Sequence, residues 1–86
     1  MFSVTLSPEA RAFYEKADPP LARKLARCFT QLERNPQKQR NIKRLKGELS
    51  GYLRYRVGDW RVVYRVDELK QSVSVVVIGH RREVYE

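Results

Sequence analysis

Apolar and polar residues alternate along residues 52–66, and the alternation predicts a β-hairpin. Two runs rich in aromatic and β-branched residues flank a Gly-Asp dipeptide at 58–59. Glycine at the first position of a two-residue loop favours a type II′ turn. With that loop, Val57 pairs with Trp60 and Arg56 with Arg61. The alternation then yields one apolar face, made of Leu53, Tyr55, Val57, Trp60, Val62, Tyr64 and Val66.

The other face of this hairpin, called the arginine face below, carries Tyr52, Arg54, Arg56, Arg61, Val63, Arg65 and Asp67. Like charges directly across two strands destabilise a sheet, so this crowding of arginines indicates a polyanionic ligand. A solvated basic face is the alternative, because exposed charges are ordinary on proteins. Parity assigns Trp60, Tyr55 and Tyr64 to the core, which leaves Tyr52 as the better candidate to stack on a base.

Helical periodicity precedes the hairpin. Residues 2–6 alternate as a short strand, and Ser7-Pro8 gives a helix start with serine as the N-cap. Asp18 caps a second helix, and Pro36 limits its end. The two apolar stripes that result predict an αα-hairpin packed on the sheet; they consist of Ala10, Phe13, Tyr14 and Ala17, then Leu21, Leu25, Cys28, Phe29 and Leu32.

The rest of the chain completes a single domain over residues 1–86. Residues 37–48 are polar and basic, anchored by Ile42 and Leu45, and residues 72–78 form the most apolar strand. The order β-α-α-β-β-β predicts an α+β fold: an N-terminal strand and an αα-hairpin on one face of a mostly antiparallel four-stranded sheet, with a short C-terminal tail. The helices can cover one sheet face, so we expect the arginine face to meet solvent or ligand. Tail residues that would complete a basic site there are His80, Arg81, Arg82 and Tyr85.

Charge and cysteine content narrow the function classes. The formal net charge is +8 and the pI about 10.1, which indicates RNA, DNA or an acidic protein as partner. With one cysteine and one histidine, the chain alone forms no disulfide and no ordinary zinc site, so we expect no metal and no cofactor. Cys28 falls inside a helical stripe and is interpreted as a core residue. Neither a spanning helix nor a signal pattern is present, so we expect a cytoplasmic protein without a membrane partner.

Three segments in order resemble the RelE branch of the RelE/ParE toxin superfamily: Leu45-Lys46-Gly47, then residues 52–64, then residues 77–85. The resemblance covers nearly the whole chain. It implies the toxin of a type II toxin–antitoxin module, an endoribonuclease that cuts mRNA in the ribosomal A site and inhibits translation. It also implies an acidic RelB-like antitoxin as partner, with operator DNA reached by the complex through the antitoxin.

The resemblance places the family's basic hairpin positions on Arg54 and Arg61, the basic residue after the last strand on Arg81, and the C-terminal tyrosine on Tyr85. Well-studied members carry a lysine pair on the first hairpin strand, where this chain has Tyr52 and Arg54. Arginine stays protonated and is a poor proton acceptor, so the general base is left unassigned. Codon preference and the identity of the antitoxin are likewise open.

Cutting RNA without a metal requires removal of the 2′-hydroxyl proton, stabilisation of the phosphorane charge and protonation of the 5′-oxygen. Guanidinium groups suit the charge, and we expect Arg61 to face solvent. His80, with a reference pKa of ~6.5, is a candidate acid or base, although a lone histidine at a strand end is more often a surface residue. Tyr85 either joins catalysis or packs the tail on the sheet. Candidate substrate-binding residues are Arg56, Arg65, Tyr52, Lys43, Lys46 and Arg82.

Two other functions remain open at this point. A ParE-type toxin shares the fold and inhibits gyrase, although the combination of Arg61, Arg81 and Tyr85 argues against it. A nucleic-acid-binding module without chemistry is the second. Cleavage of ribosome-bound mRNA separates the endoribonuclease from the binding module, and DNA breaks formed with gyrase identify the ParE type.

Overall fold

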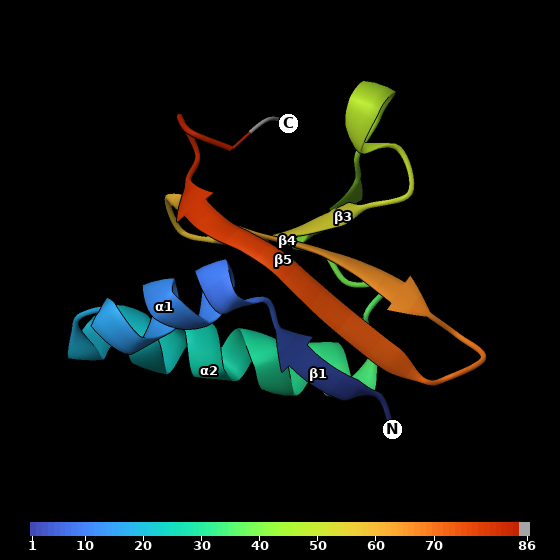
Figure 1. Cartoon of the computed structure of the whole chain (residues 1–86), viewed down its shortest axis with the longest axis horizontal. Helices are drawn as coiled ribbons and strands as arrows, with labels where there is room; N and C mark the ends of the chain where they lie inside the picture. The colour runs from blue at the N-terminus through green and yellow to red at the C-terminus, as the bar shows by residue number, and fades with distance from the viewer. Residues whose placement is uncertain (85–86) are drawn as a thin grey trace.

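Two helices cover one side of a mixed sheet in the computed structural model, which describes residues 1–84 (Figure 1). Within these residues the strands lie in the order β1-β5-β4-β3-β2, and β1 and β5 run parallel while the other neighbours are antiparallel. The predicted α+β class is confirmed. The elements are β1 (Ser3–Leu6), α1 (Pro8–Lys16), α2 (Pro19–Arg34), β2 (Ile42–Arg44), the 3₁₀ helix η1 (Gly47–Leu49), β3 (Leu53–Val57), β4 (Trp60–Asp67) and β5 (Ser72–His80).

Both helices begin at the predicted caps. The Ser7 hydroxyl accepts a hydrogen bond from the Ala10 amide at 3.0 Å and donates one to the Val76 carbonyl at 2.8 Å. Asp18 accepts from the Leu21 amide at 3.0 Å. Side-chain oxygens at these positions satisfy amides that have no partner inside a helix. Because Ser7 also reaches β5, its cap fixes α1 against the sheet.

The hairpin of β3 and β4 has the predicted register. Val57 pairs with Trp60 and Arg56 with Arg61. Gly58 has φ +60°, which matches the first central position of a type II′ turn and which glycine adopts without a steric cost. The apolar face of the hairpin packs on the helices, as expected from parity. Its members join a core cluster with Leu25, Cys28 and Leu32 of α2.

The sheet has a fifth strand that was not expected. Residues 42–44, part of the polar and basic stretch 37–48 to which no strand was assigned, form β2 and pair with β3, with Ile42 opposite Tyr55 and Lys43 opposite Arg54. A three-residue strand with two charged members shows too little alternation to be recognised. Short edge strands with lysine are common because they resist pairing with other chains.

A β-bulge interrupts β5. Val77 pairs with Val63, whereas Tyr64 pairs with Val75, so Val76 has no opposite residue on β4. A bulge shifts the alternation by one position. Val73 and Val75 therefore face the helices before it, and Ile78 faces them after it.

Burial of two ionisable side chains is consistent with the core assignment. Cys28 is 2% exposed, and its burial raises the pKa of the thiol to about 12. Burial also raises the pKa of the fully buried Tyr64, whose hydroxyl donates to the Pro36 carbonyl at 2.7 Å. In the described part of the chain, neither helix is long and apolar enough to cross a membrane.

Candidate functional site

The arginine face lies on the side of β3 and β4 away from the helices. In Figure 1, η1 and the tail after β5 both rise on this side of the sheet, while α1 and α2 lie on the other. The expected separation of a helix-covered face from an arginine-bearing face is therefore present. Its members differ in exposure: Arg56 and Arg65 are exposed, Arg54 is half-buried and Arg61 is buried.

Arg61 does not face solvent as expected. It is 8% exposed, and its Nη1 donates to the Gly58 carbonyl at 2.9 Å and to the Trp60 carbonyl at 3.0 Å. The guanidinium thus folds back over the hairpin turn, because the adjacent backbone carbonyls offer acceptors that strand parity alone does not reveal. The carbonyls of the turn thus hold the guanidinium of Arg61, the residue that pairs with Arg56 across the hairpin.

Arg54 is held by a different backbone carbonyl. Its Nη1 donates to the Asn41 carbonyl at 2.8 Å, and the same carbonyl accepts from the Arg56 amide at 2.9 Å. Lys43 lies directly opposite Arg54 on β2 and is exposed. Two basic residues, Arg54 and Lys43, therefore lie opposite each other where β2 and β3 pair, and Arg56 is the next basic residue on β3.

The tail is attached to the hairpin turn. The Arg81 amide donates to the Asp59 carbonyl at 2.8 Å, and the Arg81 Nε lies 3.9 Å from an Asp59 carboxylate oxygen. A Cβ atom at Gly79 would come within 2.9 Å of Val84 Cγ2. Since Gly79 pairs with Arg61, Val84 closes over the same sheet surface. The structure thus brings Arg56, Arg61 and Arg81 together around one turn.

Other predicted site residues lie farther along the face. The Arg65 guanidinium lies 5.9 Å from the centre of the Tyr52 ring, a cation–π arrangement. Lys46 precedes η1 and is exposed. Arg82 is exposed after β5, where its amide donates to His80 Nδ1 at 3.2 Å.

His80 lies on the helix side of the sheet. It pairs with Trp60, and the two rings meet edge to face with centroids 5.3 Å apart. The bulge at Val76 causes this placement, because uninterrupted alternation would have turned His80 toward the arginines. The structure therefore separates the histidine from Arg54 and Arg61. The remaining candidate, Tyr85, lies outside the described residues.

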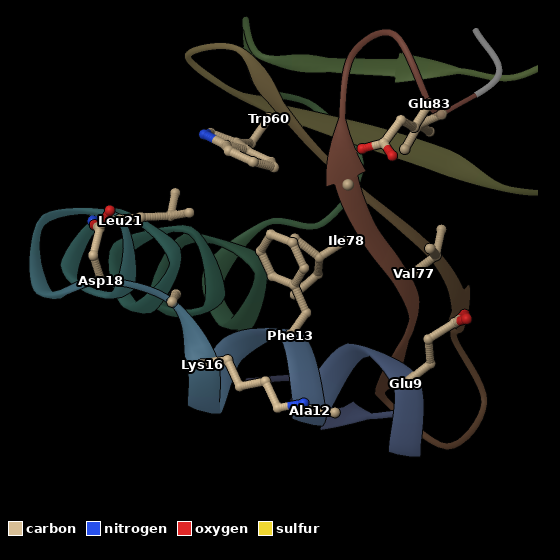
Figure 2. A pocket seen from close by; sticks show the side chains of 13 residues that line it. Glu9, Ala12, Phe13, Lys16, Asp18, Leu21, Trp60, Val77, Ile78 and Glu83 are labelled. Carbon is tan, nitrogen blue, oxygen red and sulfur yellow. The ribbon is translucent and has the colours of Figure 1, made fainter.

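A groove of about 690 Å³ opens between α1 and the end of β5 (Figure 2). Phe13, Trp60 and Ile78 form its apolar wall, with Phe13 and Trp60 ring centroids 5.4 Å apart. Its rim carries carboxylates from Glu9 and Glu83. This groove lacks the cationic character of the arginine face.

Several contributors to the site were not identified from the sequence. The Asn41 and Gly58 carbonyls position arginines through backbone atoms, so their side chains give no signal. The glycine at 79 was a possible signal, since a glycine at the end of a strand often marks close approach of another segment. Among residues 1–84, no group of three or more His, Cys, Asp or Glu side chains could hold a metal ion.

The chain is similar to known toxins over nearly its whole length. The model of the family described as "ParE toxin of type II toxin-antitoxin system, parDE" matches residues 4–85. Toxin RelG of Mycobacterium tuberculosis is 32% identical over 85 residues, which cover 98% of this chain and 95% of that protein.

Solved structures agree with the sequence comparisons. The toxin–antitoxin complex RelBE2 of M. tuberculosis contains a chain with a TM-score of 0.80 and 28% identity, covering 93% of this chain and 98% of the other. The archaeal RelE–RelB complex from Pyrococcus horikoshii has a similar fold, with a TM-score of 0.82 at 19% identity and coverage of 96% and 98%. The chain thus belongs to the ParE toxin family of the RelE/ParE superfamily and is a toxin of a type II toxin–antitoxin system.

Proposed function

We propose that this toxin is a metal-independent endoribonuclease that cuts mRNA in the ribosomal A site and so inhibits translation. The observation that supports the proposal best is the group of Arg56, Arg61 and Arg81 around one hairpin turn, with Arg54 beside it. Backbone carbonyls hold the guanidinium groups of Arg54 and Arg61 in place. Guanidinium groups match phosphate oxygens, and preorganised charge is effective in stabilising a transition state.

The chemistry is an attack within the RNA itself. The 2′-oxygen forms a bond to phosphorus, the bond from phosphorus to the 5′-oxygen breaks, and a 2′,3′-cyclic phosphate remains. A base takes the 2′-hydroxyl proton, and an acid supplies one to the 5′-oxygen. In this proposal Arg54, Arg61 and Arg81 stabilise the phosphorane charge. Tyr85 is the candidate for proton transfer, because His80 lies beside Trp60 on the helix side.

Basic and aromatic side chains that reach solvent on and beside the arginine face are the candidates for contacts with RNA outside the reacting phosphate. Arg56, Lys43 and Lys46 are exposed near the β2–β3 edge and bind neighbouring phosphates. At the other end of the face, Tyr52 with Arg65 above its ring provides a stacking surface for a base. The exposed Arg82 follows the last strand and contacts RNA that leaves the site.

Cleavage of end-labelled mRNA on programmed ribosomes tests the proposal. We expect products that end in a 2′,3′-cyclic phosphate, with no divalent ion required beyond the magnesium that ribosomes need. Arg81→Ala should slow single-turnover cleavage by at least about tenfold, because loss of one transition-state contact typically costs a few kcal/mol. Products with a 3′-hydroxyl, or intact mRNA, would contradict the proposal.

A gyrase-inhibiting activity is the second candidate, because the matching family model is the one described as ParE. It predicts double-strand DNA breaks when the toxin is mixed with gyrase and DNA. The endoribonuclease proposal predicts intact DNA in the same mixture, so one assay separates the two candidates.

We propose an acidic antitoxin as the partner. Some similar solved structures are toxin–antitoxin complexes, namely RelBE2 and YoeB-YefM of Staphylococcus aureus. A net charge of +8 favours a partner of opposite charge. Co-expression with the protein encoded beside the toxin should restore growth, and unchanged toxicity would contradict this assignment.

A further inference from the structure

A second groove, called the α2–β3 groove, runs between the second helix and the edge of the hairpin. It has a volume of about 340 Å³. Helix α2 supplies Lys24, Arg27 and Gln31, and the strand side supplies Asn41 and Arg56. These positions on α2 are spaced by three and four residues, which places them on one side of the helix. The groove therefore has a helical wall and a strand wall that both carry polar side chains.

Cationic side chains converge on this groove, and no carboxylate is among the residues that line it. Lys24, Arg27 and Arg56 are all exposed. Within residues 1–84, none of these three side chains forms an ion pair. From residue 19 to residue 32 helix α2 has no acidic residue. The adjoining pocket, which shares Lys24, has Asp18 and Asp59 in its lining. The α2–β3 groove itself is lined by three cations and by no carboxylate, so its potential is positive.

The lining of the α2–β3 groove differs from the groove beside α1. The floor consists of the buried residues Cys28, Tyr55 and Val57, and the side chains that reach solvent are cations and amides. Protein interfaces are anchored by partly exposed aromatic and aliphatic side chains, such as Phe13 and Trp60 in the α1 groove. Lysine, arginine, asparagine and glutamine are the usual donors to phosphate oxygens. The lining favours a nucleic-acid backbone over a protein.

Arg56 connects this groove to the arginine face. It pairs across the hairpin with Arg61 and also lines the α2–β3 groove. Lys24 and Arg27 lie on α2, on the opposite side of the sheet. One extended strand bound along the arginine face would contact Arg56 and leave α2 unoccupied. A folded RNA, with phosphates on several sides, can reach both walls.

We propose that the α2–β3 groove binds the phosphate backbone of a folded RNA, independently of base sequence and apart from the strand that is cut. The inference rests on the proposed function, because mRNA in the ribosomal A site is surrounded by folded RNA. A groove that binds phosphates would add affinity for that surrounding RNA. Lys24 and Arg27 are its principal contacts, and Gln31 and Asn41 donate additional hydrogen bonds.

The test compares two variants of equal charge. Lys24→Glu with Arg27→Glu changes the groove, whereas Arg11→Glu with Lys70→Glu changes two exposed positions elsewhere. Each reversal subtracts two charges, so both proteins fall from +8 to +4. Lysine, arginine and glutamate have similar helix propensities, and thermal melts verify that both variants fold. The probes are a 30-base-pair RNA duplex and polyglutamate, each titrated at several salt concentrations.

We expect the groove variant to bind the duplex at least about tenfold more weakly than the control variant. The slope of log K against log salt should fall by about two, because each lost phosphate contact removes about one. Polyglutamate binding should be equal in the two variants. Equal RNA binding by both variants, or a loss confined to polyglutamate, would overturn the inference.

Cleavage of ribosome-bound mRNA then separates this inference from the proposed function. If both hold, the groove variant should show a raised KM with kcat within about twofold of the parent. A parent protein that binds the duplex through the groove but cuts no mRNA would refute the endoribonuclease and leave the RNA-binding groove intact.

Discussion

The two faces of the sheet bury their side chains in different ways. Toward the helices, Leu25, Val62 and Tyr64 are fully buried in one apolar cluster. On the arginine face, Val63 is 1% exposed and Arg61 is 8% exposed, yet neither belongs to that cluster. The arginine face thus has a small buried layer of its own, and backbone carbonyls hold the guanidinium groups of Arg54 and Arg61 on the same face.

This difference assigns separate tasks to the two faces. Burial of apolar area dominates folding free energy, so the helix face should determine stability. A hydrogen bond to a charged group contributes about 1.5–3 kcal/mol, and here its main effect is to orient guanidinium groups.

Leu25→Ala should lower the free energy of unfolding by about 3–5 kcal/mol, since it removes a fully buried side chain and leaves a cavity. Val63→Ala on the arginine face should cost about 1–2 kcal/mol, because it removes less apolar volume. Urea denaturation measures both. A larger loss of unfolding free energy for Val63→Ala than for Leu25→Ala would mean that the buried residues of the arginine face contribute more to stability than the helix-side core.

Arg61→Ala should cost about 1–3 kcal/mol, because the Gly58 and Trp60 carbonyls lose a charged donor at a buried site. Arg56→Ala, directly across the hairpin and exposed, should stay within about 0.5 kcal/mol of the parent. Thermal melts of the pair give the comparison. Equal melting temperatures for the two variants would show that the bonds of Arg61 to the turn do not stabilise the fold.

Alkaline pH should destabilise the parent through Cys28. Its folded-state pKa is raised from 9.0 to about 12, so the unfolded chain loses this proton first. Above pH 9 the unfolded state binds fewer protons, and the free energy of unfolding falls by up to about 1.4 kcal/mol per pH unit. Subtracting the stability curve of Cys28→Ala isolates this term from other titrations. Parallel curves between pH 8 and pH 11 would contradict it.

Asp59→Asn should have the smallest effect, a change of at most about 0.5 kcal/mol. The ion pair with Arg81 is long at 3.9 Å and exposed on both sides, and such pairs contribute little. The Asp59 carbonyl still accepts from the Arg81 amide. Stability in low and high salt measures the effect, and a loss above 1 kcal/mol would give the tail a structural role.

The sequence predicted the features that depend on local chemistry and side-chain parity. Ser7 and Asp18 cap their helices as expected, and the turn at Gly58 fixes the hairpin register because loop length determines pairing. The apolar face of the hairpin followed from the same register. The separation of a basic sheet surface from the helices was therefore predictable.

Features that depend on backbone geometry were not predictable. The bulge at Val76 reverses the parity of β5 and moves His80 beside Trp60. Valine follows valine at residues 75–77, so no change of residue type marks the shift. The burial of Arg61 depends on carbonyl oxygens at Gly58 and Trp60, which every residue type provides.

The parallel pairing of β1 with β5 links folding to the completion of synthesis. Ser3 pairs with Ser72 and Leu6 with Val75, so these contacts span most of the chain and form slowly compared with local ones. Chains emerge from the ribosome at roughly 5–20 residues per second, so several seconds pass between the synthesis of β1 and that of its partner β5. A chain that stops before Ser72 leaves β1 and β4 without the strand that lies between them. Translation products that end before Ser72 therefore cannot join β1 to the rest of the sheet.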